Sequence, residues 1–231
     1  MAIKNSIKIY LENGYYHIYN RGVNKQPIFY DEQDYAVFLS YLKTYLCPKN
    51  EKELQARLAD PLTNYKEKDQ ILRILRLNNF SSEIALLAYC LMPNHFHLLL
   101  KQKSLNSIDS FMNSLCVRYS MFINKKYERV GPLYQSVYKA VLIESDEQLL
   151  YTTGYIHRNP FSKNLASKDH LFHGWLSQPS SLPEYLEQRK TEWVHPKEIL
   201  SYFSKTNPGL SYQNFIEQAN DYSPISRLMI D

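Results

Sequence analysis

The 231-residue chain has few cysteines, and no two of them are closely spaced. Cys47, Cys90 and Cys116 each lie in an apolar pattern, far from one another. A disulfide framework or a cysteine metal site would need paired spacings such as Cys-x-x-Cys, and none is present. The sequence therefore predicts reduced cysteines in the protein core.

Long apolar runs are missing as well. No run approaches the ~18 residues that are needed to span a bilayer, and the N-terminus lacks the apolar core of a signal peptide. We therefore expect a soluble, cytoplasmic protein with no membrane partner. A hydrophobic content of 44% can supply a core for one large domain or for a domain with an appendage.

The chain has no large excess of positive or negative charge, but it is rich in tyrosine. The formal net charge of +4 is modest, so charge alone does not indicate nucleic-acid binding. The 20 tyrosines are an unusual load beside 10 phenylalanines and 2 tryptophans. Tyrosine can stack on bases and donate hydrogen bonds to phosphates, although for most of the twenty a drift from Phe to Tyr is the better explanation.

The apolar periodicity predicts an α+β fold with strands and helices in a fixed order. Strands are expected over residues 14–22, 81–91, 95–102 and 137–144, and helices over residues 31–47, 106–127 and 145–159. The order is β-α-β-β-α-β followed by a helix. This is the ferredoxin-like arrangement, in which helices cover one face of an antiparallel sheet.

Two segments fall outside that arrangement. Residues 48–80 are charged and are predicted to form a helical insertion. After Pro160 the composition changes, and residues 161–231 are predicted to form a C-terminal helical tail packed on the main domain, residues 1–160. Within this tail we expect a surface stretch at 162–183 and small helices at 193–203 and 211–219.

A His-x-His pair opens the third predicted strand. Side chains i and i+2 of a strand point to the same face, so His95 and His97 project together, roughly 6–7 Å apart, and Phe96 points to the opposite, packed face. Two neutral imidazoles on one side of a strand can form half of a metal site. The spacing alone is weakly specific, and two ordinary histidines remain the alternative.

The last predicted helix offers two further groups. Tyr155 and Asn159 are four residues apart and therefore lie on one helical face. The Asn carbonyl can be a metal ligand, and the phenol, with a pKa near ~10, can be a nucleophile beside a cation or a base. A metal held by two histidines and Asn159 would polarise a phosphate beside Tyr155. The alternative is a core tyrosine and an Asn that ends the helix.

Four stretches in a fixed order make the sequence recognisable: YYHIYNRG with IFYDEQDYAVFLSYL, LLAYCLMPNHFHLLL, GPLYQSVYKAVLIESDEQLL, and YIHRNP. Together they resemble the single-domain tyrosine transposases with a His-hydrophobic-His motif, in particular the REP-associated tyrosine transposase branch. The resemblance covers residues 14–160 and, more loosely, the tail. It marks residues 1–160 as a catalytic, transposase-like domain.

The resemblance implies a role for each candidate residue. His95 and His97 match the divalent-metal ligands, Asn159 stands in the position of the third ligand, and Tyr155 matches the nucleophile. Members of this family cut single-stranded DNA near small hairpins with Mg²⁺ or Mn²⁺, forming a 5′-phosphotyrosine link that frees a 3′-OH. The link conserves the phosphoester energy, so no ATP is implied, and the chain lacks a P-loop.

The predicted protein is thus a metal-dependent DNA endonuclease and strand transferase that acts in DNA transposition on hairpin-bearing single strands. By ligand softness, two imidazoles and an amide suit Mn²⁺ better than Mg²⁺. The wider class works as dimers with exchanged helices, whereas the REP-associated branch tends to be monomeric. The connection before Pro160 shows no clear hinge, so a monomer is preferred over a homodimer.

Further residues are candidates for DNA contacts. Asn20 and Arg21 end the first strand, where the family contacts DNA, although a structural turn is an equal alternative. The others are a basic flank and two polar residues near the last strand, which could reach a phosphate: Arg118, Gln135 and Lys139. A solvated helix face is the usual meaning of a basic run such as the one around Arg118.

The sequence assigns no firm role to the remaining candidate residues. Arg189, Lys190 and Trp193 suggest that the tail covers the site or guides DNA, and a solvated helix face explains them as well. His157 lies about 160° around the helix from Asn159, so it is not predicted to be a ligand. His17 is placed on an edge strand without a role.

Two rival functions stay open. A ferredoxin-like sheet that carries aromatics also suits a non-catalytic module for single-stranded nucleic acid, although the sequence shows no RRM aromatic signature. A zinc hydrolase would need an extended His-x-His-x-Asp pattern, and Leu99 stands where the Asp would be.

Overall fold

A computed structural model describes residues 8–161 and 179–218 of the chain. Its centre is one antiparallel sheet with the strand order β2-β3-β1-β4. The strands are β1 (Tyr15–Arg21), β2 (Ile84–Met92), β3 (His95–Gln102) and β4 (Lys139–Ile143). Read from the other edge, the order is 4-1-3-2, which is the ferredoxin-like arrangement. The predicted fold class is therefore confirmed.

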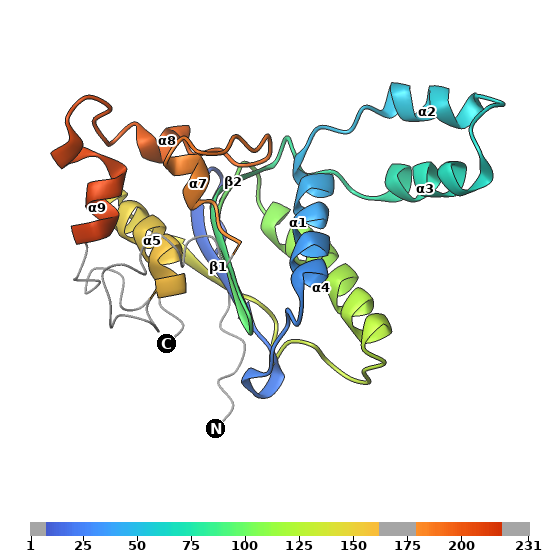
Figure 1. Cartoon of the computed structure of the whole chain (residues 1–231), viewed down its shortest axis with the longest axis horizontal. Coiled ribbons are helices and arrows are strands. Elements are labelled where there is room, and N and C mark those ends of the chain that lie inside the picture. Colours follow the sequence, from blue (N-terminus) through green and yellow to red (C-terminus); the bar gives the residue numbers. More distant parts are fainter. Residues whose placement is uncertain (1–7, 162–178, 219–231) are drawn as a thin grey trace.

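Helices cover both faces of this sheet (Figure 1). On one side lie α1 (Glu32–Leu46) and α4 (Ser107–Lys126). On the other side α5 (Asp146–Arg158) lies with three short helices of the tail, namely α7 (Leu182–Tyr185), α8 (Lys197–Leu200) and α9 (Tyr212–Gln218). The face opposite α1 and α4 is thus covered by the segments that follow the ferredoxin-like core.

Local signals in the sequence fix several boundaries. β3 begins and ends where predicted. Asp31 caps α1 by accepting a hydrogen bond from Asp34 N, and Ser145 caps α5 by accepting one from Gln148 N. The predicted helix over 193–203 is wrong, because the structure has only the short α8 there. Pro196 precedes α8 and has no N–H to continue a helix backwards.

The face toward α1 and α4 carries the larger apolar core. Alternation along β3 sends Phe96, Leu98 and Leu100 to this face, and all three are fully buried. The Phe96 ring lies 5.4 Å from the ring of Phe38 on α1, and Phe38 packs edge-on against Tyr119 of α4 at 5.0 Å. These contacts tie both helices to the middle of the sheet.

The described part of the tail pairs with the outer edge of β2. Leu91 N donates to the Pro179 carbonyl at 2.9 Å, and Ser181 N donates to the Tyr89 carbonyl at 3.0 Å. Farther along the strand, His195 N donates to the Leu86 carbonyl at 2.9 Å. These bonds satisfy backbone groups that an edge strand would otherwise expose.

The predicted division into residues 1–160 and 161–231 stays a prediction, and most of the stretch 162–183 lies outside the described residues. Within the predicted insertion at 48–80, the structure has α2 (Glu51–Ala59) and α3 (Tyr65–Arg76). These two helices form an arm that stands away from the sheet (Figure 1). Lys49 holds its base by donating to the Leu77 carbonyl at 2.8 Å.

Two further features concern the chain as a whole. The three cysteines are free thiols. Among the described helices, none combines the length and the apolar character that a membrane span requires.

Candidate active site

His95 and His97 point to the same face of the sheet, the one that α5 covers. Their side chains are almost completely buried, with exposed fractions of 2% and 0%. In the strand register His95 lies opposite Arg21, and His97 lies opposite Tyr19. Paired side chains share a face, so one imidazole has a cationic neighbour on β1 and the other has an aromatic neighbour.

The end of α5 brings Asn159 to both imidazoles. His95 Nε2 lies 3.3 Å from Asn159 Oδ1, and Asn159 Nδ2 lies 3.3 Å from His97 Nε2. Asn159 is itself buried, and it directly follows the last residue of α5. The structure thus brings together the three side chains that the sequence offered as metal ligands.

Tyr155 lies one turn earlier on α5 and packs against the same imidazoles. Its ring meets the His97 ring edge-on at 5.4 Å and the His17 ring edge-on at 5.9 Å. The tyrosine is 6% exposed, and its hydroxyl is buried. The phenol is therefore beside the histidine pair, in the surroundings of a core aromatic.

The hydrogen bonds of His95 define which of its ring nitrogens faces Asn159. Asn94 Nδ2 donates to the Lys25 carbonyl at 3.1 Å, which leaves Asn94 Oδ1 to accept the Nδ1–H of His95 at 2.6 Å. In the neutral ring His95 Nε2 then carries a lone pair. This lone pair faces Asn159 Oδ1, which is another acceptor. A cation between them, a second proton on His95, or a half-turn of the Asn159 amide group removes the conflict.

This contact tests whether the site suits a metal ion. The Nε2 atoms of both imidazoles face the Asn159 side-chain amide. Imidazole nitrogens and an amide oxygen are donors of the kind that divalent transition ions take. Within residues 8–161 and 179–218, no three His, Cys, Asp or Glu side chains gather in a way that could hold a metal. The candidate set is therefore two histidines with Asn159 as a neutral third donor, and these donors fit Mn²⁺.

The electrostatics favour a neutral His97. Burial lowers its pKa well below the ordinary value, and the neighbouring His17, His95 and Arg21 lower it further because they disfavour another positive charge. A metal-binding imidazole has to be unprotonated at the ligating nitrogen. His97 thus stays in the form that a ligand needs across the physiological pH range.

His17 is the residue that the sequence interpretation missed. The sequence interpretation puts His17 on an edge strand, and this is wrong, because β1 lies between β3 and β4 and His17 is fully buried. Its Nε2 lies 2.9 Å from His97 Nδ1. The sequence could have indicated the buried position of His17, because the predicted ferredoxin-like order already places the first strand in the middle of the sheet.

The candidate DNA contacts divide between the two faces. Arg21 and Lys139 share the histidine face, opposite His95 and Tyr19 respectively. Gln135 is exposed, and its backbone N–H donates to the Arg21 carbonyl at 3.0 Å. Arg118, in contrast, lies on α4 with its guanidinium 3.8 Å over the Tyr41 ring.

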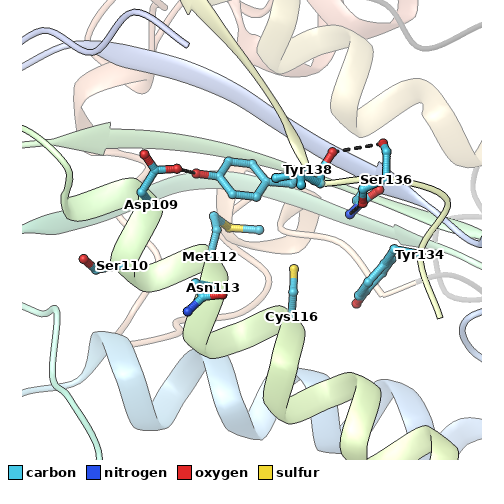
Figure 2. A pocket seen from close by; sticks show the side chains of 10 residues that line it. Asp109, Ser110, Met112, Asn113, Cys116, Tyr134, Ser136 and Tyr138 are labelled. Carbon is cyan, nitrogen blue, oxygen red and sulfur yellow. Dashed lines mark hydrogen bonds between the residues drawn. The ribbon is translucent and has the colours of Figure 1, made fainter. Parts of the chain in front are cut away.

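Asn20 points to the α4 side of the sheet. Its Nδ2 donates to the Ser136 carbonyl at 3.1 Å, and it lines a cavity of about 530 Å³ between α4 and the residues before β4 (Figure 2). The charged residue that lines this cavity is Asp109, whose carboxylate binds Lys8 and the Tyr138 hydroxyl. The residues that line the cavity include no cationic side chain that could bind a phosphate.

The tail docks on α5 through His157, which points away from the ligand set as predicted. His157 Nδ1 lies 2.6 Å from the Tyr212 hydroxyl, and its Nε2 lies 2.7 Å from Ser181 Oγ. Burial lowers the pKa of His157 to about 3. A neutral His157 thus joins two separate parts of the tail to the helix that carries Tyr155.

The cluster of Arg189 and Trp193 has structural contacts of its own. Arg189 forms an ion pair with the nearly buried Glu184 at 2.6 Å and also donates to the Ser180 carbonyl at 2.6 Å. Trp193 is buried and stacks on Tyr89 at 5.5 Å. These two side chains hold the tail against β2, and neither forms a solvated helix face.

Comparison with known proteins gives one clear result. The model of the family described as "Transposase IS200 like" matches residues 36–159, which is more than half of the chain. A search of curated proteins finds no match. Among solved structures, the chain is similar to a REP-associated tyrosine transposase bound to a REP hairpin, with 9% identity and a TM-score of 0.48 over 84% of this chain and 98% of that one. On the sequence match, the chain belongs to the IS200-like transposase family.

Proposed function

We propose that this protein is a metal-dependent endonuclease and strand transferase for single-stranded DNA, with Tyr155 as its nucleophile. The observation that carries the proposal is the convergence of Tyr155 and Asn159, both from α5, on His95 and His97 of β3. The two histidines are 64 and 62 residues away from Asn159 in the chain. Membership of a transposase family agrees with chemistry on DNA.

His95 and His97 through Nε2, with Asn159 through Oδ1, would hold a Mn²⁺ or Mg²⁺ ion. When bound, the ion supplies positive charge that polarises the scissile phosphate. The mixed imidazole and amide set favours Mn²⁺ of the two. Asn94 supports this arrangement by holding the His95 ring through Nδ1.

Tyr155 carries out the bond exchange. Its oxygen attacks phosphorus in line, the bond from phosphorus to the 3′ oxygen breaks, and a 5′-phosphotyrosine link forms. The phenol proton leaves Tyr155, and the departing oxygen gains a proton to become a 3′-OH, so protons and charge balance. Attack by a 3′-OH reverses the exchange and joins strands, which is the transfer step.

Arg21 and Lys139 would bind the phosphates of the substrate. Both lie on the face that carries the histidine pair. Cations placed beside the reacting phosphate offset the charge that develops in the transition state. Gln135, exposed next to Arg21, adds a neutral donor. Asn20 and Arg118 point to the other face and are weaker candidates for DNA contacts.

The substrate that we propose is single-stranded DNA with a hairpin. This choice rests on the four sequence stretches shared with the REP-associated branch. We also propose, from the same resemblance, that the protein acts as a monomer in the cytoplasm and that cleavage serves transposition.

The test is a search for the covalent adduct. The protein is incubated with hairpin-bearing single strands and Mn²⁺, and the product is analysed by denaturing gel and peptide mass spectrometry. Wild type should carry the nucleotide on Tyr155, and Tyr155→Phe should form no adduct. Tyr151→Phe, one turn away on the same helix, is the matched control and should react like wild type. An adduct formed by Tyr155→Phe would overturn the assignment.

The burial of Tyr155 favours a second function, namely binding of single-stranded nucleic acid without cleavage. With 6% exposure, the phenol meets a phosphodiester only after neighbouring groups move. In this second case the protein binds hairpin strands with an affinity that does not depend on divalent ions, and no adduct appears under any condition. The same samples therefore decide between the two functions.

A further inference from the structure

We propose that His17 is a positioning residue for His97: it accepts the Nδ1 proton of His97 and so directs the Nε2 lone pair toward Asn159. The inference rests on the proposed function, because it gives His97 Nε2 the role of a ligand. It adds a residue from a third element, β1, to the groups on β3 and α5.

The geometry of the pair is specific. His17 Nε2 and His97 Nδ1 are 2.9 Å apart, and the two rings lie within 21° of parallel. In the strand register His17 lies opposite Leu99, so it is the diagonal neighbour of His97 on the same face. Both imidazoles are fully buried, where a polar group without a partner is destabilising.

The direction of the hydrogen bond follows from the ligand role that we propose for His97. A histidine binds a metal through an unprotonated nitrogen, so a ligating His97 Nε2 carries a lone pair. A neutral imidazole with a lone pair on Nε2 has its proton on Nδ1. The group that faces Nδ1 is His17 Nε2, which must therefore be the acceptor.

His95 shows the same design with a different partner. Its Nδ1 proton goes to Asn94 Oδ1, and its Nε2 faces Asn159. Both candidate ligands thus have a partner at Nδ1 and present Nε2 to the Asn159 side-chain amide. A partner that holds the second nitrogen of a metal-binding histidine typically changes metal affinity by about 10–100-fold.

The first test determines the tautomer of His97 in the wild-type protein. Long-range ¹H–¹⁵N correlation spectra of the metal-free, ¹⁵N-labelled full chain identify the tautomer of each histidine, and His97→Gln assigns the His97 signals. We expect His97 in the Nδ1–H form. The Nε2–H form would overturn the proposal, because His17 would then be the donor and Nε2 would offer no lone pair.

The second test measures Mn²⁺ affinity by titration calorimetry on full-length variants. His17→Phe fills the space but accepts no hydrogen bond, and it should weaken Mn²⁺ binding by about 10–100-fold. His17→Gln can accept through its amide oxygen and should recover most of the loss. Tyr19→Phe, which changes a neighbouring ring on the same face, should bind Mn²⁺ like wild type. Equal affinity in wild type and His17→Phe would contradict the proposal.

The outcomes separate this proposal from the proposed function. If wild type does not bind Mn²⁺ at all, the proposed function fails, and the tautomer spectrum still tests the hydrogen bond. If wild type binds Mn²⁺ and His17→Phe binds it equally, the positioning role alone fails. Should His17→Phe not fold, as judged by circular dichroism, His17→Gln and the wild-type spectrum decide.

Discussion

Alternate residues of the same strands form the two faces of the sheet, yet the two faces differ in the kind of side chain that they bury. Toward α1 and α4, β3 presents Phe96, Leu98 and Leu100, which are fully buried among aromatic and aliphatic side chains. Toward α5 it presents His95 and His97, whose ring nitrogens meet polar partners. The comparison teaches that one face provides packing, whereas the other orients polar atoms in a buried setting.

The described part of the tail packs on the face of the sheet that carries the histidines. A smaller apolar cluster surrounds Tyr155 there and includes Leu182, Tyr185 and Ile216 of the tail. His157 adds hydrogen bonds between α5 and the tail within this cluster. The helix that carries Tyr155 is therefore held on one side by the sheet and on the other by residues that follow position 179.

The largest effect on stability should come from the apolar face. Phe96→Ala removes a fully buried ring in contact with α1, and the loss of burial plus the cavity should lower the free energy of unfolding by about 3–5 kcal/mol. His97→Gln, its neighbour on the other face, should cost less because the amide can keep polar partners. Urea denaturation of the two variants checks this. If the two variants lose equal amounts of unfolding free energy, the proposed difference between the two faces is wrong.

The second effect is a pH dependence that arises from the polar face. The folded-state pKa of His157 is lowered to about 3, whereas an unfolded histidine titrates near ~6.5, so the unfolded chain binds more protons between these values. The contribution of neutral His157 to the free energy of unfolding is fully present above pH 6.5. It decreases as the pH falls, by about 2 kcal/mol at pH 5. His157→Gln should show a smaller slope between pH 7 and 5. The same slope in wild type and variant would contradict this account.

The smallest effect should come from a single hydrogen bond of the tail. Tyr212→Phe removes the hydroxyl that lies 2.6 Å from His157 Nδ1 and should lower the free energy of unfolding by about 1 kcal/mol. Tyr65→Phe, in which the ring is 84% exposed, is the matched control and should leave stability unchanged. If both variants unfold at the same urea concentration, the bond between Tyr212 and His157 does not stabilise the docking of the tail on α5.

Much of the fold could be predicted because its signals are local. The alternation in β3, the caps Asp31 and Ser145, and the order of elements were enough for the ferredoxin-like core. The same local rules placed His95 and His97 on one face and Asn159 on the helical face of Tyr155. Strand alternation and helical spacing state which side chains are neighbours within an element, and the structure brings these two pairs together.

The rest depends on contacts between distant segments. The bond between His17 and His97 joins residues 80 positions apart and follows only from the strand order. The short α8 reflects Pro196 and the pairing of Val194 with Leu86, which the apolar pattern of 193–203 does not reveal. The burial of Tyr155 arises from packing against two rings on other elements, so helix periodicity could not indicate it.

The most direct test of the central claim, that His95, His97, Asn159 and Tyr155 form one metal-dependent site, is a crystal structure of the full chain grown with Mn²⁺. Anomalous difference density at the manganese absorption edge locates the ion without reference to any assumed ligand. We predict one strong peak bounded by His95 Nε2, His97 Nε2 and the Asn159 side chain, with Tyr155 beside it. Manganese bound at a different place, or no peak at saturating Mn²⁺, would contradict the account.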